Sequence, residues 1–399
     1  MRTNGAIKTG AVIAFLAAMP AHSLNIDDPS VPDALVFGPF EIQTRLDAGL
    51  VVAVGDAPDL LADLDAGFVA EAINDDGLRW GASFGLHVQR DVAREGFANR
   101  AGPQGPVNPN APQLRSLATG RYLNAASQTM RGGVAVEEAS VFLRNGWGVL
   151  RLGITPGAAM AEPPLLPTAA FLVRADGGLL DPTGLAATRT DNVISGYSPK
   201  IVLSSTRILG VRASASFTPD AQMCGVDICI HDRDSARNIA SAHLSDVIEL
   251  ALSFDHTFSQ FGQVEAGLSW ASGQPDNPLY TQDYEALGAR VRWTRGPVSI
   301  GLSTLSADGT GPGGDYVATA LAARYDYEDW SFGLETAWSE DSFLQLDSQT
   351  SQAVISRLFG DYYSVAVGVA RIESDITNIG PAVNGDSATS AFIELTGRY

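Results

Sequence analysis

Apolar and polar residues alternate along about sixteen segments of this chain, and the connections between the segments alternate in length. In LRWGASFGLHVQ (residues 78–89), the apolar residues from Trp80 to Val88 take every second position. This period of two predicts half-buried β-strands. Short connections such as NG take turns with long ones such as residues 91–133 and 156–192. Such a rhythm places short turns at one end and long loops at the other, as in an up-and-down barrel.

The predicted strands are residues 40–54, 62–73, 78–90, 134–144, 147–155, 193–203, 206–218, 246–258, 262–273, 283–294, 297–306, 315–327, 330–339, 350–359, 362–372 and 388–399. One face of these strands is apolar, and the other carries charges such as Arg45, Asp63, Glu249 and Arg290. A ring of about sixteen strands encloses a lumen too wide for side chains to fill. A polar face around water and an apolar face against lipid explain both observations. The fold class is therefore all-β, a transmembrane antiparallel up-and-down β-barrel.

The N-terminus predicts export. Arg2 and Lys8 precede an apolar run of about ten residues, and Ala21-His22-Ser23 fits a small-x-small cleavage site. Residues 1–23 are therefore predicted to be a signal peptide that is removed, leaving residues 24–399 as the barrel. The remaining 24 basic and 45 acidic residues give a net charge of −21, which excludes nucleic acid as a partner.

The only cysteines, Cys224 and Cys229, lie five positions apart in the exported chain and predict a disulfide that closes a small loop. A metal site with His231 and Asp232 is the alternative, but it lacks the spacing of a zinc site. No resident metal or cofactor is predicted. The acidic loops ADGTGPGGD and SEDSFLQLDSQ could bind calcium, although solvated external loops are the default interpretation.

Three stretches together resemble the Gram-negative general porins, particularly the alphaproteobacterial type. They are VEEASVFLRNGWGVLRLGITPGAAM (136–160), ISGYSPKIVLSSTRILGVRASASFTPD (194–220) and AFIELTGRY (391–399). The resemblance implies a homotrimer of sixteen-stranded barrels in the lipid bilayer of the outer membrane, each forming an aqueous channel for small hydrophilic solutes. It also implies that the third loop, residues 156–192, folds inward and narrows the pore.

That loop departs from the family pattern. It is rich in Ala, Leu and Pro, its acids are few, with Glu162, Asp176 and Asp181 among them, and it lacks a PEFGGD-type motif. Strand parity selects pore-lining cations, because selectivity depends on pore diameter and on the charges that line it. These candidates are Arg45, Arg79, Arg151, Lys200, Arg212, Arg290, Arg292 and Arg398. The alternative is that several of them form structural ion pairs with inward-facing acids.

The chain ends on a strand in which Glu394 and Arg398 are expected to face water. In the porin family such a terminal aromatic strand is what the outer-membrane assembly machinery recognises, so Tyr399 is the expected assembly signal. No catalytic motif is found, and the expected function is passive diffusion of ions and small solutes. A substrate-selective channel for sugars or oligopeptides is the nearer alternative, and a secreted soluble all-β binding protein or hydrolase is the more distant one. The net charge predicts a modest preference for cations.

Overall fold

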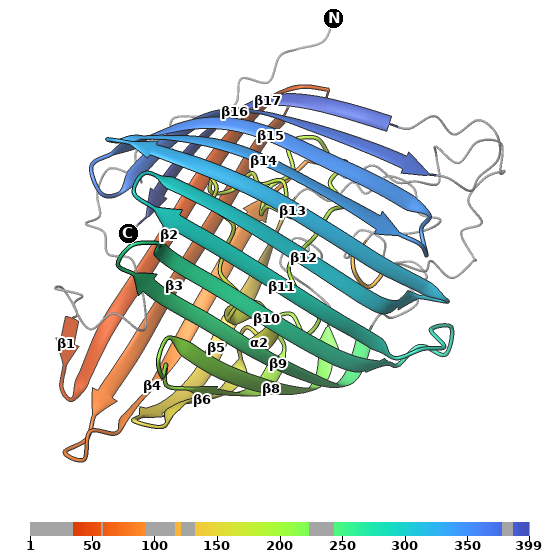
Figure 1. Ribbon diagram of the computed structural model, residues 1–399. Coiled ribbons are helices and arrows are strands. Elements are labelled where there is room, and N and C mark those ends of the chain that lie inside the picture. Colours follow the sequence, from red (N-terminus) through yellow and green to blue (C-terminus); the bar gives the residue numbers. More distant parts are fainter. Residues whose placement is uncertain are drawn as a thin grey trace, which may run out of the picture.

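The chain forms one closed β-barrel. The computed structural model describes residues 35–56, 59–92, 116–120, 132–222, 243–376 and 386–398. The ring of strands runs from β2 to β17, and every neighbouring pair in it is antiparallel. Figure 1 shows the strands running obliquely around the barrel. The prediction of a sixteen-stranded antiparallel barrel is therefore confirmed.

The strands of the ring are β2 (Phe40–Gly55), β3 (Asp59–Ile73), β4 (Arg79–Arg90), β5 (Gly132–Asn145), β6 (Gly148–Ile154), β7 (Pro199–Ser205), β8 (Val211–Gln222), β9 (His243–Phe258), β10 (Gly262–Pro275), β11 (Tyr284–Arg295), β12 (Val298–Gly311), β13 (Gly314–Tyr327), β14 (Trp330–Asp341), β15 (Leu346–Phe359), β16 (Tyr363–Ile376) and β17 (Asp386–Arg398). A short additional strand, β1 (Leu35–Phe37), pairs with the start of β2.

The last strand closes the ring by pairing with the first long one. In this seam Ser390 of β17 lies opposite Gly55 of β2, and Arg398 lies opposite Asp47. Within the described residues, every strand of the ring β2–β17 then has a partner on both sides, so the ring leaves no sheet edge with unpaired N–H and C=O groups facing lipid.

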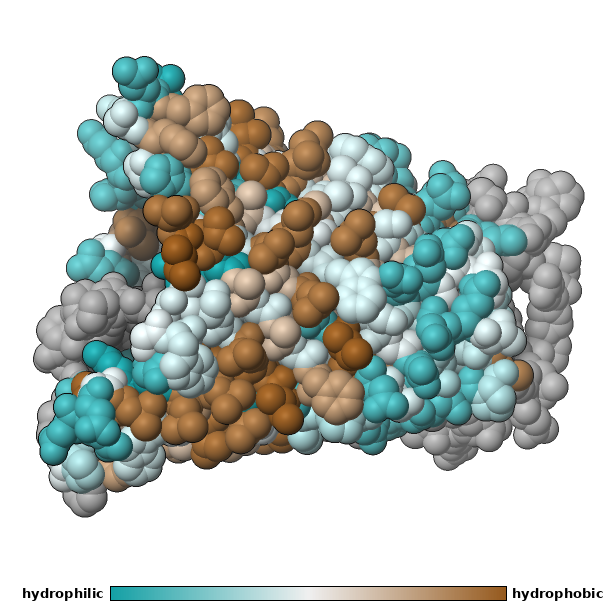
Figure 2. All heavy atoms as spheres, turned by 60° about the horizontal axis from the view of Figure 1, so that its bottom comes forward, coloured by the Kyte–Doolittle hydropathy of each residue, from teal (hydrophilic) through white to brown (hydrophobic). Residues whose placement is uncertain are grey.

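Large apolar side chains cover the outer face of the barrel. Leu252, Leu268, Leu334 and Val367 are each about half exposed and point away from the lumen. Figure 2 shows the apolar residues gathered across the middle of the molecule, with hydrophilic residues toward both ends. An outer apolar band with polar rims is typical of a barrel that spans a bilayer. Within the described residues, no helix has the length and apolar character that crossing a membrane requires.

Two predicted boundaries are wrong. The strand predicted at 193–203 begins at Pro199, and the turn that follows it lies at residues 206–210 rather than at Ser204-Ser205. Leu209 and Gly210 have positive φ angles (52° and 86°), two consecutive left-handed residues that are typical of a tight turn and rare in a regular strand.

The loops predicted at 307–314 and 340–349 are also largely strand. The connection between β12 and β13 is only Pro312-Gly313, and that between β14 and β15 is residues 342–345. Apolar alternation stops where the lipid-facing band stops, but the hydrogen-bond ladder continues beyond it into polar sequence. The strict rhythm of short turns and long loops therefore does not hold at these two connections.

Residues 155–198, which we call the inner segment, connect β6 to β7 and lie within the barrel. Figure 1 shows them as a yellow-to-green trace crossing the interior. They contain α2 (Ala158–Ala161), a single helical turn that contacts strands β7 to β10. Residues 116–120, which belong to the connection between β4 and β5, reach the wall across the barrel, where the Leu117 N–H donates to the Thr310 carbonyl (2.6 Å).

Candidate channel and inner segment

Buried carboxylates on the barrel wall hold the inner segment. Glu394 of β17 accepts hydrogen bonds from three consecutive backbone N–H groups, those of Phe171 (2.6 Å), Leu172 (3.0 Å) and Val173 (3.2 Å). Glu335 of β14 accepts the Ala175 N–H at 3.0 Å and also bonds the Thr168 hydroxyl. Hydrogen bonds to a charged acceptor are about twice as strong as those between neutral groups. These acids therefore fix the middle of the inner segment against the wall.

A buried charge cluster fixes the second half of the inner segment. Arg174 donates to both oxygens of Asp176 (2.7 and 2.8 Å), and Arg290 of β11 bonds Asp191 and lies 3.7 Å from Asp176. Burial alone would raise the pKa of Asp176, but Arg174 and Arg290 outweigh it and hold the pKa of this carboxyl below its ordinary value. Asp176 therefore stays ionised between two arginines.

Inward-facing glycines let the inner segment lie directly on the wall. A Cβ atom on Gly267 of β10 would lie 2.6 Å from the Cα atom of Pro163, and one on Gly333 of β14 would lie 2.8 Å from the Cβ atom of Ala169. Gly301 of β12 makes the same kind of approach to Pro167. Any side chain at these positions would push the inner segment toward the centre of the lumen.

The sequence predicts a uniformly polar inner wall, and the structure shows that this prediction is wrong. Beneath the inner segment it presents small apolar residues such as Ala320, Ala322 and Ala337, which are almost fully buried against Leu166 and Ala175. Leu172 and Val173 of the inner segment pack against a second cluster of buried apolar residues, which belong to strands β2, β3, β15, β16 and β17. This packing explains why the inner segment is rich in Ala, Leu and Pro.

Several predicted pore-lining residues are buried instead. The side chain of Lys200 on β7 is 3% exposed and donates to the Ser195 hydroxyl and the Gly196 carbonyl, both at 2.6 Å. Arg290, 6% exposed, anchors the inner segment as described above. Both were expected to face the water of the pore, and both are covered by the inner segment. The alternation of residues along the strands correctly predicts that Lys200 and Arg290 lie on the inner face. It carries no information on whether another part of the chain covers that face.

The predicted acids of the constriction loop are also turned away from open water. Asp176 is 1% exposed and Asp181 is 4% exposed. Asp181 accepts the N–H groups of Thr183 (2.9 Å) and Ala186 (2.8 Å), so it shapes the backbone of the inner segment. Glu162 is half-buried and accepts the hydroxyl of Ser214 (2.5 Å). Glu394 is likewise 1% exposed, although it was expected to face water.

The wall formed by β2 to β6 carries charged residues that remain partly exposed. A cavity of about 230 Å³ is bounded by Arg45, Asp65, Glu137 and Glu138 together with Tyr197 of the inner segment. Arg45 pairs with Asp65 of the next strand at 2.6 Å.

Two other arginines that were predicted to line the pore form ion pairs with glutamates. Arg79 pairs with Glu71 (2.8 Å), and Arg292 makes two bonds to Glu265 (2.5 Å each). Arg45, Arg79 and Arg292 thus form ion pairs with inward-facing acids of neighbouring strands, as in the alternative interpretation, whereas Arg290 pairs with acids of the inner segment.

The remaining predicted cations, Arg151, Arg212 and Arg398, also sit on the inner face. Arg151 and Arg212 are half-buried, and both continue the inward parity of their strands. The Arg398 guanidinium lies 3.7 Å from the ring centre of Phe171, in a cation–π contact with the inner segment.

Three predictions concern residues outside the described ranges. They are the signal peptide at residues 1–23, the Cys224–Cys229 disulfide and the role of Tyr399. Each of them stays a prediction.

Sequence reasoning missed the carboxylates and glycines that position the inner segment. A signal for the glycines was present, because inward glycines at 49, 267, 301 and 333 each precede an outward leucine. A Gly-Leu pair that recurs at inward positions of several strands marks a wall that another piece of backbone approaches closely. Glu394 and Glu335 carried no such signal, since inward acids are also common on water-filled lumen walls.

Comparison with known proteins places the chain in a family. The sequence model described as Gram-negative porin matches residues 41–391. No curated protein sequence matches the chain.

Solved structures share the barrel at low sequence identity. A porin structure aligns at 16% identity and a TM-score of 0.54, covering 90% of this chain and 100% of the other. An anion-selective porin from Comamonas acidovorans aligns at 13% identity and a TM-score of 0.53, with 90% and 100% coverage. The outer membrane protein OmpT of Vibrio cholerae, in a trimer form, aligns at 12% identity and a TM-score of 0.54, with 90% and 99% coverage. At these identities the likeness concerns the fold alone.

Family and fold together point to a channel rather than an enzyme. The match of the family model extends over most of the chain, and the ring it covers has a lipid-compatible outer face and a charged inner one. The chain belongs to the Gram-negative porins and forms an outer-membrane channel for passive diffusion.

Proposed function

We propose that the inner segment is the constriction of this channel, and that ions and small hydrophilic solutes pass between it and the β2–β6 wall. The observation that carries the proposal is the position of the charged side chains that hold the inner segment, which also packs on β2 and β3 through Leu172. Glu394, Glu335 and Arg290 hold the inner segment against strands β11 to β17, whereas the cavity beside β2 to β5 stays open to charged side chains. The residues of the constriction are therefore those of the wall and not the buried acids of the inner segment.

The charge of this wall supports a modest preference for cations. The acids Asp47, Asp65, Glu71, Glu137 and Glu138 face the lumen from β2, β3 and β5, whereas the arginines on the same wall are fewer. Fixed charges of one sign raise the local concentration of the opposite ion. A reversal-potential measurement across a planar bilayer, with a tenfold KCl gradient, tests this: the expected sign is that of cation selectivity, and an anion-selective sign contradicts it.

We further infer that the channel works as a homotrimer. Support comes from the fold likeness to the trimer form of OmpT and from the broad apolar outer face, which can meet lipid or a second copy. Light scattering of the detergent-purified protein is expected to give three chains per particle, and a band that shifts on boiling is expected in denaturing gels. A monomeric mass in several mild detergents contradicts the proposal.

A further inference from the structure

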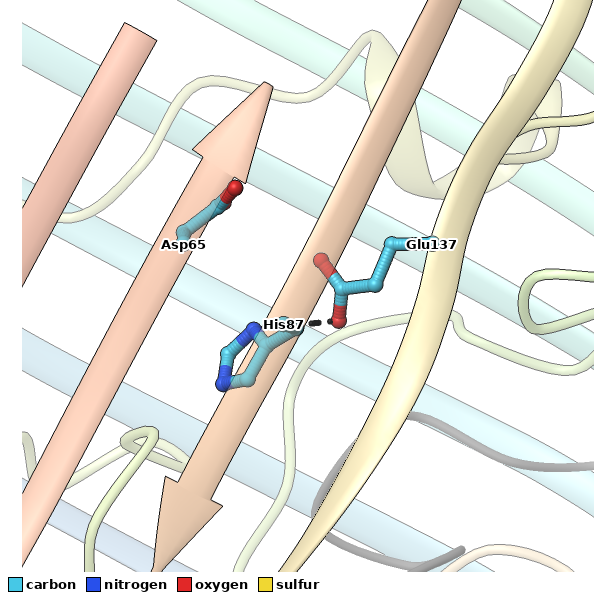
Figure 3. Close-up of side chains that lie close together, drawn as sticks. All are labelled: Asp65, His87 and Glu137. Atoms are coloured by element: carbon cyan, nitrogen blue, oxygen red, sulfur yellow. Dashed lines mark ion pairs between the residues drawn. The ribbon is translucent and has the colours of Figure 1, made fainter.

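A histidine and two carboxylates meet on the open wall of the lumen. One ligand atom from each of Asp65, His87 and Glu137 lies within 4.8 Å of the others. The residues come from the adjacent strands β3, β4 and β5, and Figure 3 shows the imidazole of His87 facing the carboxylate of Glu137. His87 is 3% exposed, so the geometry of its ring is fixed by its neighbours.

Asp63 holds one nitrogen of this imidazole. The Nε2 atom of His87 lies 2.7 Å from Oδ2 of Asp63, and that hydrogen bond assigns the proton to Nε2. Nδ1 then points at Oε1 of Glu137, 3.2 Å away, in the spacing of an ion pair. Two lone pairs cannot face each other at that distance unless a positive charge lies between them.

The positive charge is either a second proton on the imidazole or a metal ion. Two ligand atoms that flank a tetrahedral metal at about 2.1 Å each lie about 3.4 Å apart, close to the spacing of Nδ1 and Oε1. A ligating histidine almost always donates its other ring N–H to a carboxylate, which is the role that Asp63 takes here. The arrangement thus has both a ligand set and the partner that orients it.

A β-bulge creates the second ligand. Gly85 of β4 pairs with Glu138 and Leu86 pairs with Val136, so Glu137 is an extra residue in β5. The bulge turns two consecutive glutamates toward the lumen, where regular alternation would have sent one of them to lipid. Glu138 accepts the hydroxyl of Ser83 (2.6 Å), which leaves Glu137 to face His87.

The site opens on the 230 Å³ cavity beside the inner segment. Tyr197 lines this cavity, and its hydroxyl lies within hydrogen-bond reach of Glu137. Arg45 is the competing cation, since it occupies Oδ2 of Asp65 at 2.6 Å. An entering ion must share Asp65 with this arginine.

We propose that His87, Glu137 and Asp65 bind a divalent transition-metal ion from the water of the pore, with Asp63 as the positioning residue. One imidazole nitrogen with two carboxylates suits Zn²⁺ or Co²⁺, whereas Mg²⁺ and Ca²⁺ prefer oxygen ligands alone. Bound there, the ion adds positive charge beside Arg45 and opposes the passage of cations.

Metal binding is tested on the full, detergent-purified, chelator-treated channel. Titration with Co²⁺ is expected to produce a visible ligand-field absorption that saturates at one ion per chain, and Zn²⁺ is expected to remove it. His87→Ala and Glu137→Gln should abolish the saturable band, and Asp63→Asn should weaken binding about 10- to 100-fold. The matched control is His256→Ala, because His256 is an exposed ring packed on Phe258 (4.5 Å between centres) outside the lumen.

A bilayer recording gives an independent readout. Micromolar Zn²⁺ is expected to lower the single-channel conductance of the wild type and of His256→Ala but not of His87→Ala. The proposal is overturned if the folded wild type gives no saturable Co²⁺ band, which would assign the charge between Nδ1 and Oε1 to a proton. It is equally overturned if His87→Ala and Glu137→Gln, both heat-modifiable and folded, bind Co²⁺ as the wild type does.

Discussion

The carboxylate of Glu394, on the strand that closes the barrel, accepts the backbone N–H of Leu172 in the middle of the inner segment at 3.0 Å. The same carboxylate also accepts the two N–H groups that flank it, and Glu394 is 1% exposed. The carboxylate of Glu394 therefore links the seam of the barrel directly to the backbone of the inner segment.

Removing this carboxylate should release the inner segment. Glu394→Ala leaves three backbone N–H groups without their acceptor, at a cost of about 1.5–3 kcal/mol for each bond to a charged group. The expected result is a higher and noisier single-channel conductance and faster entry of larger sugars in liposome swelling. Glu394→Gln keeps one acceptor oxygen and should have a smaller effect. Glu373→Gln is the control, because Glu373 pairs with Arg371 at 2.5 Å on the outer side of the barrel; equal effects of the substitutions at 373 and 394 would refute the anchoring role.

Filling the glycine positions should narrow the pore. Gly267→Val places methyl groups where Pro163 lies and should push the inner segment into the lumen, since proline cannot give way as a flexible side chain does. We expect lower conductance with the barrel intact by circular dichroism. Gly146→Ala is the matched control, because nothing lies within 4 Å of a Cβ atom at that turn. Unchanged conductance in Gly267→Val would show that the inner segment does not rest on the wall.

The Arg292–Glu265 pair offers a test of how paired wall charges act. Arg292→Gln should shift the reversal potential toward cations and Glu265→Gln toward anions, because each leaves one unbalanced charge in the lumen. The double variant should return to near the wild-type potential, because the two opposite changes in charge cancel. Its loss of unfolding free energy should be smaller than the sum of the two single losses, because the second substitution removes a partner that the first has already left unpaired. Strictly additive shifts in unfolding free energy across the cycle would mean that the two side chains do not interact.

The buried cluster of Asp176 with Arg174 and Arg290 predicts a dependence on acid. Arg174 and Arg290 hold the pKa of Asp176 below its ordinary value of 3.8. A depressed pKa stabilises the fold above the ordinary value, and that stabilisation is lost as pH falls through the lower pKa of the folded state. The contribution of Asp176 to conductance and melting temperature should therefore stay constant from pH 7 down to about pH 4. Both quantities should decrease at lower pH.

Asp176→Asn is the comparison for that acid dependence. It should lower the melting temperature at pH 7 and flatten the part of the decline that lies below pH 4. An acid profile in Asp176→Asn that matches the wild type over this range would assign the transition to other carboxylates.

The barrel could be predicted from the sequence because its outer face obeys one rule along every strand. Apolar residues such as Leu268 and Leu334 take every second position wherever lipid is the solvent, so strand number and facing follow from periodicity. The pattern ends where the lipid ends, so periodicity alone predicts loops at the polar extensions of β12 and β14.

The channel could be predicted only in part, because the residues of the inner face have different surroundings: some face a cavity and others are covered by the inner segment. Parity places Lys200 and Arg45 on the same side of the wall, yet one is covered by the inner segment and the other faces a cavity. The bulge at Glu137 breaks the alternation outright. Which wall the inner segment covers depends on contacts between residues far apart in sequence, such as Glu394 with Leu172, and a single sequence carries no record of those.

Thiol accessibility in the conducting channel tests the central claim, that solutes pass along the β2–β6 wall and not beneath the inner segment. In a background where Cys224 and Cys229 are replaced by serine, Arg151→Cys places a thiol on the half-exposed inner face of β6, and Ala322→Cys places one on the covered face of β13. A charged methanethiosulfonate reagent is expected to change the single-channel conductance of Arg151→Cys within seconds and to leave that of Ala322→Cys unchanged. Rapid modification of Ala322→Cys, with Arg151→Cys unaffected, would contradict the account.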